Sequence, residues 1–165
     1  MSAIIGDAGS RSGVIGEIGE TREVRFYAYG GLDGTVTVAN TNGVPFGQIP
    51  ENVGGGMHAS NGVFTAPVAG IYSFYVQIYN YHSGTVNYVW QCIANSQASA
   101  YQIVGRFHGQ TAQGMMVTFG GVKWLRVNES VNITNNSGGS RNFYSGTGHH
   151  TMFVGALIRA GGAYI

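Results

Sequence analysis

The sequence predicts an all-β protein, a two-sheet jelly-roll sandwich of about ten strands that follows a short glycine-rich leader. Three observations lead to this prediction. From Glu23 onward apolar and polar residues alternate with a period of two, and there is no convincing helical period. The apolar runs are strand-sized, and turn residues separate them. Their number matches the strand count of a jelly roll.

The expected strands follow in chain order from the alternation and the flanking turns. They are Glu23 to Tyr29, Thr35 to Ala39, Gly62 to Thr65, Gly70 to Tyr79, Thr85 to Ala94, Tyr101 to His108, Gly114 to Gly120, Lys123 to Val127, Ser130 to Thr134 and Thr151 to Arg159.

The clearest strand is Gly70 to Tyr79, which has one apolar and one mixed face. The face expected in the core carries Tyr72, Phe74, Val76 and Ile78, and the opposite face carries Ser73, Tyr75, Gln77 and Tyr79. Two tyrosines among small polar groups are typical of a subunit interface. They are equally explained by the β propensity of tyrosine. Both interpretations stay open.

The last strand, Met152 to Ile158, is apolar on both faces. A strand of this kind is either central in its sheet or covered by a neighbouring subunit.

Composition limits the classes of function. A chain of 165 residues suits one domain, and we divide it into a leader, residues 1–22, and a jelly-roll domain, residues 23–165. Only 9% of residues are charged and the net charge is +1, so no nucleic-acid partner is expected. No apolar run approaches the ~20 residues that span a bilayer, so no membrane insertion is expected. A sheet with so few charges to protect its edges favours oligomerisation.

The leader contains glycines at three-residue spacing with one slip: Gly6, Gly9, Gly13, Gly16 and Gly19. One interpretation is a flexible glycine-rich segment. The other is a docking segment, because the leader also carries five apolar residues that suit anchoring: Ile4, Ile5, Val14, Ile15 and Ile18.

We find no catalytic, metal or cofactor site in the sequence. The seven carboxylates are scattered, and the five histidines lack the spacing of a zinc site. Cys92 is alone and is expected to be a small core residue. No Gly-x-Ser-x-Gly elbow occurs. The pair His149-His150 is either a surface-loop feature or, around a threefold axis, a cluster of three copies.

The stretch from Phe46 to Val76 resembles the signature of the C1q/TNF-like domain family. Six positions fall at the family's spacings: Phe46, Asn52, Phe64, Gly70, Tyr72 and Phe74. The run from Asn61 to Tyr72, NGVFTAPVAGIY, is close to the most recognisable family segment, although Met57 and Val76 stand where aromatics are usual. Residues Arg126 to Val131 and Phe153 to Ile158 are similar to later family segments, so the resemblance covers about residues 23–160.

The resemblance implies a non-catalytic trimer that binds proteins, glycans or surfaces, with three copies packed through apolar faces. The residues expected in the core signature and the trimer interface are Phe46, Asn52, Phe64, Gly70, Tyr72, Phe74, Tyr75, Tyr79 and Phe153. Candidate ligand-binding loops carry Tyr81, His82, Arg141, Phe143 and Tyr144. Their rings and polar groups suit either stacking on sugars or covering the trimer.

The functional prediction is a homotrimeric virion-surface protein, a bacteriophage head-fibre, decoration or tail-appendage knob. The chain opens without the basic start and apolar run of a secretory signal, and residues 10–16 resemble leader segments of phage structural proteins. We expect a capsid or tail protein to bind residues 1–20, and a host-surface protein or glycan to be the ligand. The alternative is a secreted adhesion or pattern-recognition protein of a cellular organism.

Overall fold

The computed structural model describes residues 23–32, 34–96, 99–111 and 113–161. These residues form strands, turns and loops, and they include no helix long and apolar enough to cross a membrane. The five leader residues proposed as anchors, Ile4, Ile5, Val14, Ile15 and Ile18, lie outside the described residues.

The first of two large sheets is named here the β6 sheet after its longest central strand. Its order is β3-β1-β12-β6-β9, and every neighbouring pair is antiparallel. The strands are β3 (Gln48–Val53), β1 (Arg25–Tyr29), β12 (Met152–Ala160), β6 (Gly70–Tyr79) and β9 (Met116–Leu125).

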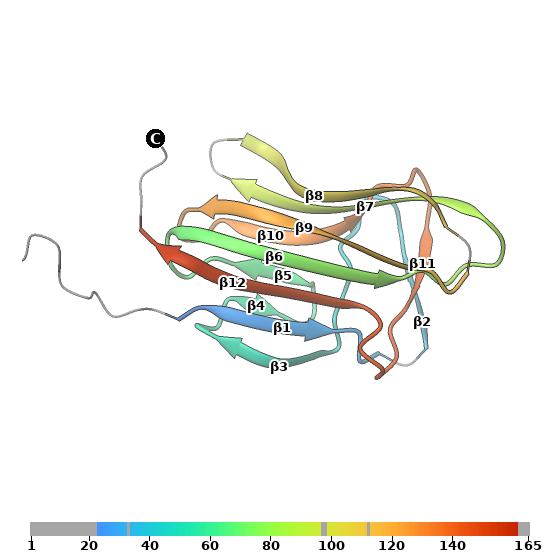
Figure 1. The fold of residues 1–165 in the computed structure, drawn as a ribbon, viewed down its shortest axis with the longest axis horizontal. Coiled ribbons are helices and arrows are strands. Elements are labelled where there is room, and N and C mark those ends of the chain that lie inside the picture. The colour runs from blue at the N-terminus through green and yellow to red at the C-terminus, as the bar shows by residue number, and fades with distance from the viewer. Residues whose placement is uncertain (1–22, 33, 97–98, 112, 162–165) are drawn as a thin grey trace, which may run out of the picture.

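The second large sheet, the β7 sheet, has the order β4-β5-β10-β7-β8 and is also antiparallel. Its strands are β4 (Met57–His58), β5 (Val63–Thr65), β10 (Ser130–Asn135), β7 (Val86–Ser96) and β8 (Ser99–Thr111). A small third sheet pairs β2 (Thr35–Val38) with β11 (Arg141–Tyr144). Figure 1 shows β10, β5 and β4 behind the β6 sheet, and the β2-β11 pair at one end of the molecule.

The core lies between the two large sheets and is rich in aromatic rings. Phe26 of β1 contacts Phe64 of β5 and Phe153 of β12, each at 4.8 Å between ring centroids. From the other side, β7 contributes Trp90 and Cys92, both fully buried. These rings come from alternate positions of their strands. Their burial removes a large apolar area from water, which stabilises the fold.

The observed strands confirm the predicted two-sheet jelly roll and correct several of its details, among them the division of β9. Gly114 to Gly120 and Lys123 to Val127 were expected as separate strands, but β9 runs unbroken through Gly120 and Gly121. A Cβ atom on Gly120 would lie 2.1 Å from the Phe74 carbonyl oxygen. The glycine therefore permits β9 to approach β6 closely, rather than marking a turn.

Candidate functional site

The outward surface of the β6 sheet, named here the β6 face, is the candidate functional site. Antiparallel register places Tyr27, Val154, Tyr75 and Gly120 side by side in one row across four strands. These positions alternate along their strands with buried residues such as Phe26 and Phe74, so the three side chains of the row point away from the core, and Gly120 carries none. The middle of the face is thus apolar and aromatic.

Neighbouring rows continue this character. One row contains Tyr29, Met152 and Gln77, and Tyr79 pairs with Met116 near the end of β6. Several large apolar side chains on the face are exposed, among them Tyr75 at 44%, Met116 at 55% and Val122 at 62%. Contiguous exposed apolar surface of this kind usually marks an interaction site.

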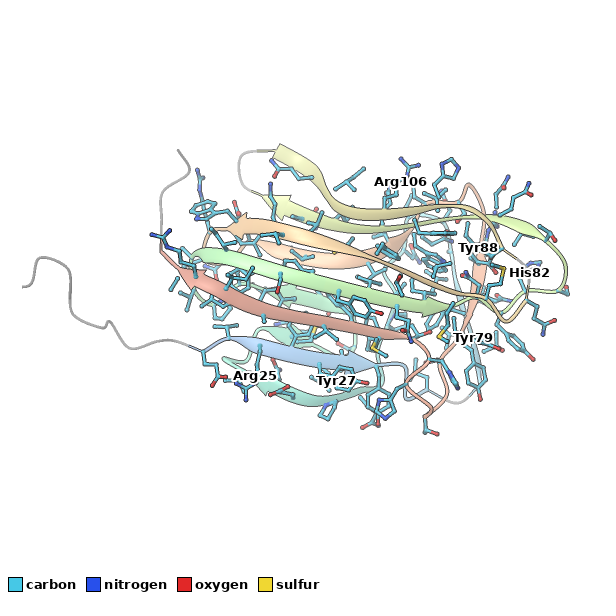
Figure 2. The ribbon with its side chains drawn as sticks, viewed as in Figure 1. Arg25, Tyr27, Tyr79, His82, Tyr88 and Arg106 are labelled. Carbon is cyan, nitrogen blue, oxygen red and sulfur yellow. The ribbon has the colours of Figure 1, made fainter. Side chains whose placement is uncertain are left out.

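Charge on the face is confined to its margins. Arg25 of β1 forms ion pairs with Glu23 and with Glu51 of the edge strand β3. Figure 2 shows Arg25 and Tyr27 following one another along β1. Because Arg25 is neutralised by these carboxylates, the adjoining Tyr27–Tyr75 row meets no unpaired charge from β1.

A tyrosine-histidine cluster lies at the β1 side of the face. The Tyr27 hydroxyl lies 2.5 Å from Nδ1 of His149, and the two rings stack at 5.7 Å with an interplanar angle of 3°. The Tyr29 ring lies 4.1 Å from the His149 ring. Burial, with a smaller contribution from Tyr29, raises the pKa of Tyr27 above its usual value. The phenol is therefore neutral at physiological pH.

His150 occupies a different aromatic setting from His149. Its ring lies 5.3 Å from that of Tyr79 and 5.5 Å from that of Tyr144. Gln77 donates from Nε2 to the His150 carbonyl oxygen at 3.2 Å. Within one chain, the two histidines thus belong to separate clusters. Among the described residues, no three His, Cys, Asp or Glu side chains come close enough to hold a metal ion.

The signature residues divide between core and surface. The residues that are buried in the core are Phe46, Phe64, Tyr72, Phe74 and Phe153. Gly70 is also buried, and a Cβ atom there would lie 2.3 Å from the Arg159 carbonyl oxygen. Asn52 binds both the amide nitrogen and the carbonyl oxygen of Met57 through its side chain. Of the nine, Tyr75 and Tyr79 lie on the β6 face.

The residues proposed for ligand loops also separate. Tyr81 is exposed at 37%, and its ring lies 5.9 Å from that of Tyr144, which is half-buried. His82 contacts the neighbouring Ser83 carbonyl through Nδ1. Arg141 donates from Nε to the Asn87 carbonyl oxygen at 2.7 Å. Phe143 is fully buried, so Tyr81 and Tyr144 are the aromatics of this set that a ligand can reach.

The arrangement offers groups suited to binding. Cys92 is fully buried, and burial raises the pKa of its thiol well above the usual range, so the reactive thiolate is suppressed. Glu51, which lies beside the β6 face, is engaged with Arg25. The face instead offers aromatic rings and aliphatic groups, which are the side chains enriched at the centres of protein interfaces.

Sequence reasoning did not single out Tyr27, Tyr29 or Val154 as parts of this face. The alternation that indicates an outward face was present in β1, where Arg25, Tyr27 and Tyr29 alternate with Phe26 and Ala28. What the sequence could not show is the register that aligns Tyr27 with Val154 and Tyr75.

Comparison with known proteins agrees with this architecture. No curated protein sequence matches the chain. The globular domain of zebrafish complement 1qA matches with a TM-score of 0.63 and 17% identity, over 84% of this chain and 99% of that one. Eiger TNF from S. frugiperda matches with a TM-score of 0.69 and 13% identity, over 87% and 98%. Murine APRIL at pH 5.0 matches with a TM-score of 0.64 and 14% identity, over 82% and 99%.

These likenesses show a shared fold. The family is identified by sequence, because the model of the C1q domain matches residues 29–158, which is most of the chain. That range includes all twelve strands except the first four residues of β1 and the last two of β12. The chain belongs to the C1q domain family.

Proposed function

We propose that the protein is a non-catalytic homotrimeric binding module of a virion surface, and that the β6 face forms the contact between protomers. The observation that supports a trimer is the exposed aromatic and apolar β6 face, whose charges lie at its margin. C1q domains commonly form trimers, which agrees with this proposal. Three copies of a weak site then bind a surface with avidity.

The trimer is tested at the centre of the β6 face with Tyr75→Glu. Tyr75 is exposed and its hydroxyl donates to the Gln77 side chain on the same strand, so the substitution costs an isolated chain little. In a trimer it places three unpaired carboxylates in an apolar interface, at about 2 kcal/mol or more for each. Light scattering should therefore show monomer for Tyr75→Glu.

The matched control is Gln110→Glu, which adds the same charge at an exposed position of β8 in the β7 sheet. This variant should remain trimeric. If Tyr75→Glu assembles as well as the control does, the β6 face is not the contact between protomers.

Attachment to a particle is proposed to run through residues 1–20. The support is the sequence itself: glycines that let the backbone pass closely along a partner, with the apolar anchors Ile4, Ile5, Val14, Ile15 and Ile18 between them. The capsid or a tail protein is the expected partner. Deleting residues 1–20 should abolish incorporation into particles and leave the trimer intact.

Mass spectrometry of purified virions tests the location directly, with the deletion variant as control. Peptides of the protein should be present at stoichiometric amounts in virions and absent after the deletion. Absence of the full-length protein from virions would contradict this location. Its appearance in the medium of uninfected cells would favour a secreted adhesion protein, an alternative suggested by the fold shared with zebrafish complement 1qA.

The host-facing contact is proposed at the end of the molecule where β6 leads into Tyr81. Figure 2 shows Tyr79 and His82 at this end. Tyr81 and Tyr144 supply adjacent rings there, 5.9 Å apart. A double substitution of both tyrosines by alanine should weaken binding to host cells without changing the trimer.

A further inference from the structure

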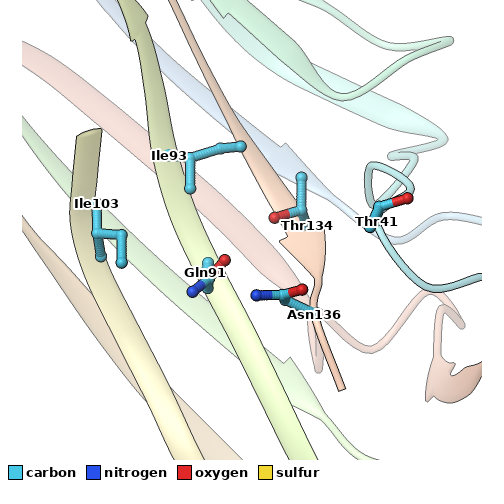
Figure 3. A pocket seen from close by; sticks show the side chains of 6 residues that line it. All are labelled: Thr41, Gln91, Ile93, Ile103, Thr134 and Asn136. Carbon is cyan, nitrogen blue, oxygen red and sulfur yellow. The ribbon is translucent and has the colours of Figure 1, made fainter. Parts of the chain in front are cut away.

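A cavity of about 450 Å³ opens on the outward side of the β7 sheet. Its lining, drawn in Figure 3, consists of Thr41, Gln91, Ile93, Ile103, Thr134 and Asn136. Gln91 and Ile93 alternate along β7 with the core residues Trp90 and Cys92, so they point away from the sandwich. The volume falls within the range of small-molecule binding sites.

The cavity has a polar half and an aliphatic half, and strand register creates both. Thr134 of β10 lies directly opposite Gln91 of β7. Two residues further along β7, Ile93 lies directly opposite Ile103 of β8. Thr41 and Asn136 complete the polar half, as the close-up in Figure 3 shows.

Backbone hydrogen bonds hold the polar half in place. The Asn136 amide donates to the Val89 carbonyl oxygen at 2.8 Å, and the Thr41 amide donates to the Asn135 carbonyl oxygen at 2.6 Å. Thr41 has a φ of 69°, a left-handed conformation that is unusual for a β-branched residue. Strained backbone of this kind concentrates at ligand-binding sites, where the surrounding structure maintains it.

Two polar side chains of the lining are largely buried, and their hydrogen-bonding groups are open to the cavity. Gln91 is 8% exposed and Thr134 is 6% exposed, yet within the described part of the chain neither side chain makes a hydrogen bond. Their polar atoms are not among the fully buried, unpartnered atoms of the described residues, which are Asn80 Nδ2, Thr111 Oγ1 and Asn132 Oδ1, so solvent in the cavity reaches them. Because both side chains line the cavity, a molecule within it can be the partner that they lack.

The chemistry of the lining selects the class of ligand. All four polar side chains are uncharged, and each both donates and accepts hydrogen bonds, as does a sugar hydroxyl. The two isoleucines offer an aliphatic surface for the C–H face of a sugar ring. A charged ligand would need a cation or carboxylate in the lining, and a lipid chain would leave the amides unpaired.

We propose that this cavity binds a pyranose ring of a neutral glycan. Gln91 and Thr134 bind ring hydroxyls, and Ile93 and Ile103 contact the C–H face. The inference rests on the proposed function as a multivalent binding module, since three such sites on one trimer engage a glycan-covered surface together.

The test uses two near-isosteric substitutions that remove hydrogen bonding and keep volume, Thr134→Val and Gln91→Met. Within the described residues neither side chain makes a hydrogen bond, so the melting temperature should be unchanged or raised. The readout is methyl NMR of the full chain labelled at isoleucine, titrated with glucose, galactose, mannose and N-acetylglucosamine at millimolar concentration. Sorbitol, a linear polyol, is the ligand control.

At least one pyranose should shift the Ile93 and Ile103 methyl signals, while sorbitol should not. Each substitution should weaken this binding by about tenfold or more, the loss expected for one good hydrogen bond. The matched control Asn87→Ala, at an exposed position of β7 outside the lining, should bind as the unaltered protein does.

The proposal is overturned if no pyranose shifts either methyl signal, if sorbitol shifts them equally, or if binding persists undiminished in both variants. Light scattering on the same samples separates this result from the proposed assembly. A monomer whose isoleucines respond to a pyranose contradicts the trimer and supports ligand binding in the cavity. A trimer whose isoleucines do not respond supports the trimer and contradicts ligand binding in the cavity.

Discussion

Gly62 shows how one residue enforces a close approach between segments. The Asn61-Gly62 pair predicts a tight turn, and the glycine adopts a φ of +63°. The structure adds a contact that no turn rule predicts, because a Cβ atom on Gly62 would lie 2.0 Å from the Val44 carbonyl oxygen. That oxygen belongs to a segment 18 positions earlier in the chain.

Gly62→Ala should therefore lower the free energy of unfolding by about 2–4 kcal/mol, from left-handed strain together with steric overlap. Urea denaturation measures this loss. Gly55→Ala is the control, since Gly55 has a φ of +72° and a Cβ atom added there would have no neighbour within 4 Å, and it should cost only about 1 kcal/mol. Equal losses in the two variants would contradict the role assigned to the Val44 contact.

The burial of Tyr72 makes the stability of the fold depend on pH. Its ring is fully buried, its hydroxyl donates to the Val68 carbonyl oxygen at 2.6 Å, and burial raises its pKa above 10.0. The folded state thus favours the neutral phenol, whereas the unfolded chain ionises first as the pH rises. The resulting stability is complete below the unfolded pKa of about 10 and is lost above it.

The free energy of unfolding should accordingly fall as the pH rises past about 10, with Tyr88, whose pKa burial also raises, contributing. Tyr72→Phe should cost about 1 kcal/mol at neutral pH, because the hydrogen bond to Val68 is lost. It should also make the alkaline fall shallower. Denaturant titrations between neutral and alkaline pH measure both effects, and a fall of unchanged steepness would contradict the assignment to Tyr72.

At the scale of elements, the sequence predicts best the strands whose alternation is strong. β6 has the predicted bounds and the predicted division into a core and an outward face. β12 is apolar on both faces, which the sequence explains either by a central place in the sheet or by a neighbouring subunit. In the structure β12 lies centrally between β1 and β6. Gly155 in this strand leaves room for the rings of Phe26 and Phe74, a packing relation that no alternation pattern contains.

The strands that the sequence did not predict are β3, β4 and β11. β3 includes Pro50, Glu51 and Asn52, which disfavour strands in general but are tolerated at a sheet edge, where β3 lies.

β11 was interpreted as part of a ligand loop. It pairs with β2 and directs Phe143 into the core, which local sequence could not reveal because the partner lies about a hundred residues away.

The β3 edge suggests a test of the signature asparagine. The Asn52 side chain accepts from the Met57 amide at 3.0 Å and donates to the Met57 carbonyl oxygen at 2.9 Å, joining the end of β3 to β4. Asn52→Ala leaves both Met57 groups without this partner, so it should cost about 1–3 kcal/mol. Hydrogen exchange at the Met57 amide should quicken, and Asn87→Ala, on exposed β7 surface, should change neither quantity.

At the scale of the whole molecule, two of the surfaces proposed for partners belong to different sheets. The β6 face is apolar and aromatic, whereas the cavity on the β7 sheet is lined by amides, hydroxyls and isoleucines. The fold directs these surfaces to opposite sides of the sandwich. Assembly through the first therefore leaves the second open to ligands.

The sequence could indicate the family, because spaced residues such as Phe64, Gly70 and Tyr72 are local in the chain. It could not indicate the cavity, because its lining comes from the Thr41 loop, β7, β8 and the β10 end, which only register brings together. Nor could it extend the proposed interface beyond Tyr75 and Tyr79. Both surfaces depend on long-range pairing, which alternation alone does not specify.

The central claim is that the protein works as a trimer. Sedimentation equilibrium of the unaltered chain, from low micromolar to high micromolar concentration, tests it most directly. The account predicts one species with three times the mass of a single chain, independent of concentration in this range. A single-chain mass throughout the same range would contradict it.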